Sequence, residues 1–207
     1  MKVTAEIALI ALSLILGWSC SERKSPLAKE EEIILRLVHD KSQSENYRKS
    51  AGILLDVLQE KENIMIRDFL NTDRELSSVR SLVAAQAWIA FMEATEKKFP
   101  DTLPSAEEMD KEEKRNNKNT ITMLYYSTMI RLQLINSCIS ALTYLDMPES
   151  KSALDSFFQR FEKKYGGSSG GKKILESYRL ERSQREYDVQ KGNVPWKTGL
   201  KIYRGLE

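Results

Sequence analysis

Helix-breaking residues are scarce in this chain and unevenly placed. The 207 residues include five prolines and nine glycines, and four of those glycines lie in the six-residue stretch 166–171. Elsewhere apolar residues recur at spacings of three and four, which is the period of an amphipathic helix. Hydrophobic residues make up 41% of the chain, enough for a core. The sequence therefore predicts an all-α fold, an irregular antiparallel bundle of six or seven helices.

Capping signals and breaks divide the chain into the expected helices. Ser25 before Pro26 is typical of a helix start, and capping boxes occur at 72–75 and 105–108. Pro148 is expected to open another helix. The tail at 192–207 has no helical period. In chain order, the expected helices cover 26–44, 47–70, 72–99, 105–116, 120–145, 148–165 and 172–190.

The glycine-rich stretch 166–171 is predicted to be a flexible linker. It would join a helical bundle domain, 26–165, to a basic helix with an aromatic tail, 172–207. The stretch matches the nucleophile motif G-x-S-x-G and nearly matches a phosphate-binding loop. Both motifs require a preceding β-strand, whereas a helix is expected here. We therefore interpret the glycines as a connection and not as a catalytic or nucleotide site.

The first twenty residues have the pattern of an export signal. Lys2 is followed by a run of thirteen uncharged residues, Ile7–Ser19. As a helix this run spans about 20 Å, which is shorter than the roughly 30 Å hydrocarbon core of a bilayer. A short apolar run behind a basic start is typical of a secretory signal peptide.

The end of this run resembles the lipobox of bacterial lipoproteins. The residues are Leu16-Gly17-Trp18-Ser19-Cys20, with a small residue directly before the cysteine. The leucine stands four places before the cysteine instead of three, and Trp18 is bulky, so the pattern is similar to the looser lipoboxes of spirochaetes. Ordinary signal cleavage and an uncleaved short anchor are the alternatives.

The resemblance to lipoproteins implies a location as well as a modification. The signal peptide, 1–19, would be removed, and Cys20 would carry lipid such as palmitate at the start of a short tether, 20–25. The protein would then be lipid-anchored in a bacterial cell envelope, at the outer membrane, on its periplasmic or surface-exposed face. Cys138 would be the remaining cysteine, and we expect it to be buried or to pair with another molecule.

Residues for metal or acid–base chemistry are few. The chain has one histidine, His39, and two cysteines, which argues against a structural zinc site. Carboxylates cluster at 30–32 and at 107–113, near expected helix starts, where negative charge is favourable. We therefore predict no catalytic residue, no metal ligand, no cofactor and no enzyme activity.

Charge is distributed unevenly along the chain. The net charge of +2 is too small to predict nucleic-acid binding. Residues 21–113 hold 20 acidic and 14 basic side chains, whereas residues 114–207 hold 9 acidic and 17 basic ones. Basic residues interleaved with aromatic ones could bind a partner or an anionic surface. The alternative is a helix packed on the bundle. The candidate surface-binding residues are Arg179, Arg182, Arg185, Lys191, Trp196, Lys197 and Tyr203.

The leading functional hypothesis is a membrane-tethered structural or macromolecule-binding module. Its partners would be the membrane, through lipid on Cys20, and envelope proteins or an anionic surface. A second hypothesis is a carrier of a lipid or a small apolar ligand. The residues that would line its pocket, or form an ordinary core, are Trp88, Phe91, Met123, Met129 and Phe157.

A third hypothesis is an adaptor. The segments 88–101 and 156–168 share aromatic residues, a Glu-Lys-Lys-like pattern and a turn. This pattern resembles the end of a tetratricopeptide-type helix pair, and the two turns are separated by nearly twice the usual repeat.

Overall fold

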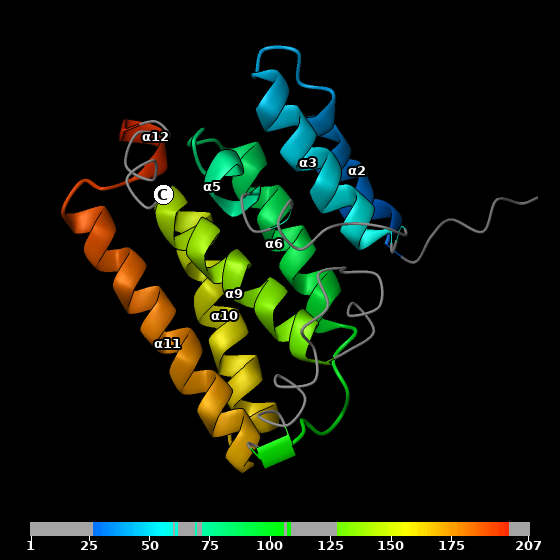
Figure 1. Cartoon of the computed structure of the whole chain (residues 1–207), viewed down its shortest axis with the longest axis vertical. Coiled ribbons are helices and arrows are strands. Elements are labelled where there is room, and N and C mark those ends of the chain that lie inside the picture. Colours follow the sequence, from blue (N-terminus) through cyan, green and yellow to red (C-terminus); the bar gives the residue numbers. More distant parts are fainter. Residues whose placement is uncertain are drawn as a thin grey trace, which may run out of the picture.

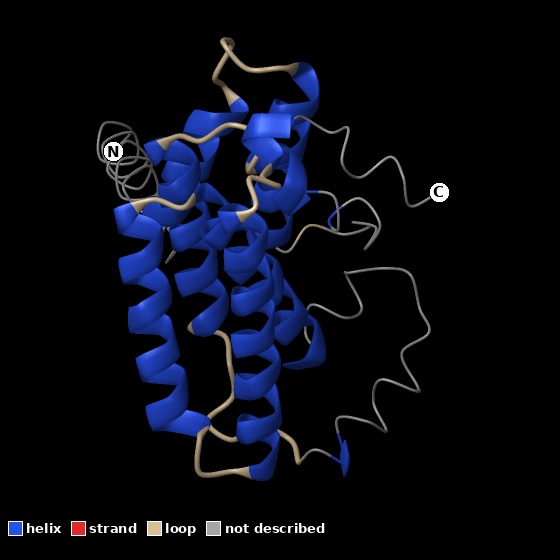
Figure 2. Cartoon of the chain, turned by 90° about the vertical axis from the view of Figure 1, so that its left-hand side faces the viewer, coloured by secondary structure: helices blue, strands red, loops and turns tan. Residues whose placement is uncertain are grey.

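The computed structural model describes residues 27–59, 61, 69, 72–105, 107–108 and 128–198. The part of the chain that it describes is helical and contains no strand (Figure 2). The prediction of an all-α helical bundle is therefore confirmed. The helices are α2 (Ala28–Val38), α3 (Glu45–Leu58), α5 (Thr72–Leu76), α6 (Leu82–Glu96), α9 (Thr128–Leu145), α10 (Pro148–Tyr165), α11 (Ser169–Gln190) and α12 (Pro195–Thr198) (Figure 1).

Four long helices, α6, α9, α10 and α11, alternate in direction. The carboxyl end of α6 meets the start of α9, where Arg131 donates to the Lys98 carbonyl oxygen. Helices α10 and α11 are antiparallel. Arg179, the earlier residue of α11, pairs with Glu162 of α10, and the later Arg182 pairs with Asp155, which comes before Glu162. The hairpin of α2 and α3 packs on the same bundle through α6.

Helices α9 and α11 run in the same direction side by side. The Tyr178 hydroxyl donates to the Leu132 carbonyl oxygen at 2.8 Å. Later in both helices, Arg185 donates to the Tyr144 hydroxyl at 3.0 Å. Helix α11 is thus fixed along its length to the centre of the bundle.

The first predicted helix is shorter than expected. Helix α2 ends at Val38, His39 is its C-cap residue, and a turn separates it from α3. Asp40 holds this turn by accepting hydrogen bonds from the backbone N–H and the hydroxyl of Ser42. Ser44 then caps α3 by accepting from the Tyr47 N–H at 3.1 Å. Short polar side chains that satisfy local backbone groups compete with helix continuation at this point.

The predicted helix over 72–99 is broken in two. Helix α5 ends at Leu76, and α6 begins after Ser81, whose hydroxyl accepts from the Ala84 N–H at 3.1 Å. Ser78 donates to the Glu75 carbonyl oxygen at 2.5 Å within the break. A third serine, Ser77, reaches the Ala141 carbonyl oxygen of α9 at 3.5 Å.

Two other predicted helix boundaries are confirmed, whereas the helix expected over 47–70 ends earlier, at Leu58, with Gln59 as its C-cap residue. Pro148 opens α10. The expected capping box has both of its hydrogen bonds, since Ser105 N–H donates to Glu108 at 2.8 Å and Glu108 N–H donates to Ser105 at 3.2 Å. Helix α9 is described from Thr128, and the earlier part of the helix expected over 120–145 lies outside the described residues.

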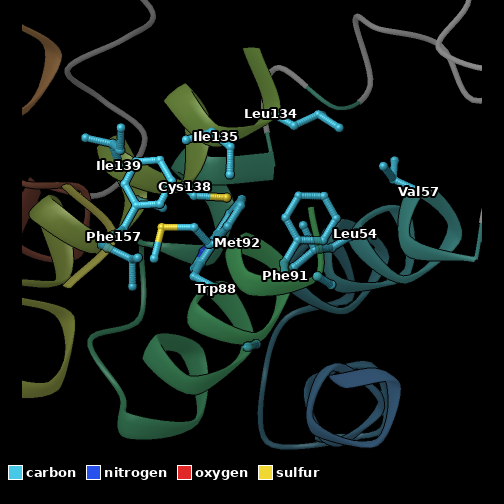
Figure 3. Packing of buried hydrophobic residues seen from close by; sticks show 14 of the residues in the cluster. Leu54, Val57, Trp88, Phe91, Met92, Leu134, Ile135, Cys138, Ile139 and Phe157 are labelled. Atoms are coloured by element: carbon cyan, nitrogen blue, oxygen red, sulfur yellow. The ribbon is translucent and has the colours of Figure 1, made fainter. Parts of the chain in front are cut away.

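The core lies between α6, α9 and α10 and extends to α3 (Figure 3). Trp88, Phe91 and Phe157, which the carrier hypothesis places in a ligand pocket, are fully buried within this packed cluster. The structure does not describe Met123 or the side chain of Met129. Other buried members labelled in Figure 3 are Leu54, Val57, Met92, Leu134, Ile135, Cys138 and Ile139.

The stretch 166–171 differs from the flexible linker expected from its composition. Ser168 is the N-cap of α11 and accepts from the Gly171 N–H at 2.9 Å. Gly170 and Gly171 are buried in the first turn of α11. A β-carbon at Gly171 would overlap the carbonyl oxygen of Tyr165, the last residue of α10. The glycines therefore permit a close turn between two packed helices.

Gly171→Ala is expected to destabilise the protein by about 1–3 kcal/mol, the usual cost of overpacking a closed site. This loss would appear although alanine favours helix formation over glycine. Gly167→Ala is the matched control, because a β-carbon there meets no atom within 4 Å. Urea unfolding followed by circular dichroism measures both. Equal stability of the two variants would contradict the close-turn interpretation.

Candidate functional site

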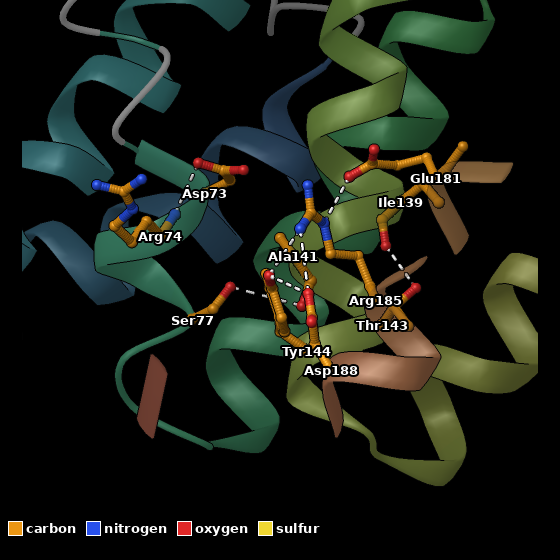
Figure 4. Close-up of polar contacts among 10 residues, drawn as sticks. All are labelled: Asp73, Arg74, Ser77, Ile139, Ala141, Thr143, Tyr144, Glu181, Arg185 and Asp188. Carbon is orange, nitrogen blue, oxygen red and sulfur yellow. Dashed lines mark hydrogen bonds and ion pairs between the residues drawn. The ribbon is translucent and has the colours of Figure 1, made fainter. Parts of the chain in front are cut away.

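The main polar cluster of the bundle lies between α5, α9 and α11 (Figure 4). We call it the Arg185 cluster, and it consists of Asp73, Tyr144, Glu181, Arg185 and Asp188. Its position follows from the parallel packing of α9 and α11, with α5 contacting α9. It joins residues that are distant in the sequence.

Arg185 is the centre of the cluster. Its Nε donates to Glu181 at 2.7 Å, and its guanidinium also contacts Asp188 at 3.2 Å. The guanidinium carbon lies 5.3 Å from the centroid of the Tyr144 ring. Burial acts to lower the pKa of Arg185, but the hydrogen bond with Glu181 and its charge outweigh burial, so the pKa is raised. Arg185 therefore stays charged and organises the two carboxylates.

Asp73 is the unusual member of the cluster. Its carboxylate accepts from the Arg74 N–H at 2.7 Å, and it has no ion pair within the described part of the chain. Burial raises its pKa from 3.8 to about 6, although the charges of Arg74 and Arg185 oppose the shift. Glu181 adds to the shift because it is also negative. A desolvated carboxyl that titrates near pH 6 is a recognised mark of a functional site.

Cys138 and Tyr178 lie on the apolar side of this region. Cys138 is a free thiol and is fully buried. Burial is one of the two states that the sequence predicts for it, the other being pairing with another molecule. Burial raises its pKa well above the usual value, and the charge of Asp73 adds to the effect. Burial likewise raises the pKa of Tyr178. Both groups therefore remain protonated, and Cys138 is not an activated nucleophile.

A second polar contact closes the carboxyl end of α9. Arg80 donates to the carbonyl oxygens of Leu145 at 2.8 Å and Asp146 at 2.5 Å. The Trp196 indole N–H donates to the Tyr144 carbonyl oxygen at 3.0 Å. The Arg80 guanidinium also lies 5.1 Å from the Trp196 ring centroid. These groups satisfy the carbonyl oxygens that a helix end leaves without intrahelical partners.

The structure places the predicted surface-binding arginines in ion pairs within the bundle. Arg179 pairs with Glu162 of α10 at 3.0 Å. Arg182 pairs with Asp155 at 2.7 Å and lies over the Phe158 ring at 5.6 Å. Together with Arg185, these two arginines hold α11 to α9 and α10. This arrangement matches the alternative expectation from the sequence, a helix packed on the bundle.

The other four candidates have different positions. Lys191 is exposed, and its ammonium lies 5.5 Å from the Tyr187 ring centroid. Trp196 belongs to the contact at the end of α9 described above. The side chain of Lys197 and the whole of Tyr203 lie outside the described residues, as does Cys20. Among the five candidates with described side chains, the three arginines hold α11 to its neighbours, Trp196 caps the end of α9, and Lys191 is exposed.

Sequence reasoning missed Asp73, Tyr144 and Arg80. Asp73 looked like part of a helix-start signal, and its burial depends on α9 and α11, which are distant in the sequence. Arg80 lies in the break between α5 and α6, a position that the sequence pattern predicts to be inside a helix. No local pattern marks these residues, because tertiary contacts define their roles.

Three surface hollows are described, and their linings do not include Asp73, Trp88, Phe91 or Phe157. One lies between α9, α10 and α11 and has a volume of about 310 Å³. Its charged lining residues are Asp146, Lys151, Arg182 and Glu186. Within the described residues there is no group of three His, Cys, Asp or Glu side chains placed to hold a metal ion.

Comparisons give no relative from which a role could be transferred. Protein-family profiles, curated proteins and solved structures contain no match to the chain. Of the helices in the described ranges, none has the length and the apolar character needed to cross a membrane.

Proposed function

We propose that this chain is a membrane-tethered helical lipoprotein of the bacterial envelope, in which the bundle is a structural or macromolecule-binding module. The observation that carries the proposal is the uncharged run Ile7–Ser19 followed directly by Cys20. A cysteine at that place resembles the lipid-modified residue of bacterial lipoproteins. The helical bundle would be the part that meets partners.

The spacing between Cys20 and the bundle supports action close to a membrane. Seven residue steps separate Cys20 from Leu27, where the described structure begins. A fully extended chain of that length reaches about 25 Å at most. The bundle would therefore stay within that distance of the lipid, which raises its effective concentration for neighbouring envelope components.

The ion pairs of α11 define which residues can test partner binding. Arg182 and Arg185 hold the helix in place, so their replacement would disturb the fold as well as a surface. Exposed residues of α11, such as Leu180 and Lys191, are the suitable probes. The packed positions of Trp88, Phe91 and Phe157 give the carrier hypothesis no support.

The proposed anchor is tested by the intact mass of the full-length product, extracted from bacterial membranes, beside that of Cys20→Ala. We expect a chain that starts at Cys20 and carries added acyl mass. The variant should lack the acyl mass. An unmodified chain that starts at another residue, or that retains Met1, would contradict the proposal.

A further inference from the structure

The outer face of α11 has no neighbour in the described structure. Figure 1 shows α11 at the edge of the bundle, with α9 and α10 on its inner side. Leu175 and Tyr178 face inward and are buried. Leu180 and Tyr187 are 70% and 54% exposed. Two large apolar side chains on one helix face are therefore left in solvent.

These residues belong to a straight stripe along the helix. With about 100° of rotation per residue, Glu176, Leu180, Tyr187 and Lys191 lie within about 30° of one line. Ser183 and Gln184 lie beside the centre of this line and are exposed and uncharged. We call these six residues the outer stripe of α11.

The outer stripe is complementary to the same stripe of a second copy that runs in the opposite direction. The midpoint between Leu180 and Tyr187 falls between Ser183 and Gln184, and so does the midpoint between Glu176 and Lys191. A two-fold axis at that point places Leu180 against Tyr187 of a second copy. It also brings Glu176 near Lys191 of that copy, at both ends of the contact. Such self-complementarity is the requirement for a two-fold symmetric interface.

The charges at the two ends are available for this contact. Glu176 is exposed and makes no ion pair with the residues that the structure describes. The Lys191 ammonium lies 5.5 Å from the Tyr187 ring centroid, which keeps it close to the stripe. A parallel arrangement would instead place Glu176 against Glu176 and Lys191 against Lys191. The charges therefore favour the antiparallel arrangement.

We propose that α11 pairs antiparallel with α11 of a second copy of this chain, through the outer stripe. Ser183 stands next to the axis, where a small side chain permits close approach of the helices. This inference goes beyond the proposed envelope module and does not depend on it, because the stripe lies on the folded bundle and not on the anchor.

Cysteine cross-linking of the full chain tests the pairing. At the 8–10 Å separation of packed helices, the β-carbons of the two Ser183 residues would lie about 5–6 Å apart. The two Ser177 residues would lie about 20 Å apart along the helices. Ser183→Cys should therefore give at least about tenfold more disulfide-linked dimer than Ser177→Cys after mild oxidation, since disulfides need short β-carbon distances.

The control for cross-linking is the unsubstituted chain, which measures any contribution of Cys20 and Cys138. Leu180→Glu in the Ser183→Cys background should abolish the dimer while leaving the far-ultraviolet circular dichroism unchanged. Equal cross-linking at the two serines, no cross-linking at Ser183, or cross-linking to a different protein would each overturn the proposal.

Charge reversal gives a test that a loss of folding cannot imitate. Glu176→Lys or Lys191→Glu alone should reduce the Ser183→Cys dimer by about tenfold, because each brings like charges together twice. The combination of both reversals should restore the dimer. A double variant that dimerises no better than either single variant would overturn the antiparallel arrangement.

Discussion

Replacing Phe157 with alanine is expected to lower the free energy of unfolding by about 3–5 kcal/mol, which is the usual cost of removing a buried aromatic ring. Phe157 is fully buried on α10. Its ring centroid lies 5.7 Å from that of Phe161 and 5.9 Å from that of Tyr178. The substitution would therefore open a cavity between α10 and α11. Such a loss is a large part of the stability of a typical domain, about 5–15 kcal/mol.

Phe158→Ala is the matched control for this prediction. Phe158 is the next residue of the same helix, and it is only partly buried, beside Arg182. Its loss of stability should be less than half of that for Phe157→Ala. Urea unfolding monitored by circular dichroism measures both variants. A small and equal effect at the two positions would contradict the packed core and favour the carrier hypothesis.

Replacing Asp73 with asparagine is expected to stabilise the protein at neutral pH. The folded-state pKa of Asp73 is raised from 3.8 to about 6. Well below pH 3.8 the carboxyl is protonated in both the folded and the unfolded state and does not affect stability. As the pH rises from about 4 to 6, the unfolded state releases its proton first, so stability falls. Above pH 6 the full cost of the desolvated carboxylate is about 3 kcal/mol at most.

Asp73→Asn should therefore raise the free energy of unfolding by about 1–3 kcal/mol at pH 7.5 and change it little at pH 4. The asparagine side-chain oxygen can still accept from the Arg74 N–H. The groups that face Asp73 and enter this balance are Arg74, Glu181, Arg185 and Cys138.

Asp101→Asn is the control for the effect of Asp73, because Asp101 is an exposed aspartate that pairs with Lys164. It should show no comparable gain at pH 7.5. Urea unfolding of both variants and the parent chain at the two pH values gives the comparison. A loss of stability at pH 7.5, or the same change at both pH values, would contradict the assignment of a costly charge to Asp73.

Periodicity was sufficient to predict the helices that form the core. Apolar residues of α9 that recur every four positions, such as Ile130, Leu134 and Cys138, are buried. The same pattern could not locate the breaks near Asp40 and Ser78, because those depend on side-chain hydrogen bonds to nearby backbone groups. Apolar spacing continues across both breaks and therefore conceals them.

The candidate site was less predictable than the fold. Composition marked the arginines of α11 as surface-binding residues, but the carboxylates that pair with them lie on α10 and α11 and contact them only after folding. Composition also indicated a linker at 166–171, where the close approach of Gly171 to Tyr165 requires glycine for steric reasons. Glycine occurs both in flexible linkers and in close turns between packed helices. Only the position of the neighbouring helix shows which of the two roles it has here.

The contact between Trp196 and the end of α9 has a consequence for the order of assembly during synthesis. The Tyr144 carbonyl oxygen receives its hydrogen bond from a residue 52 positions later in the chain, after α10 and α11. Until Trp196 has emerged, this end of α9 depends on Arg80 and water for its hydrogen bonds. The end of α9 is therefore completed only after α10 and α11 have been synthesised, so a nascent chain keeps this helix end open until then.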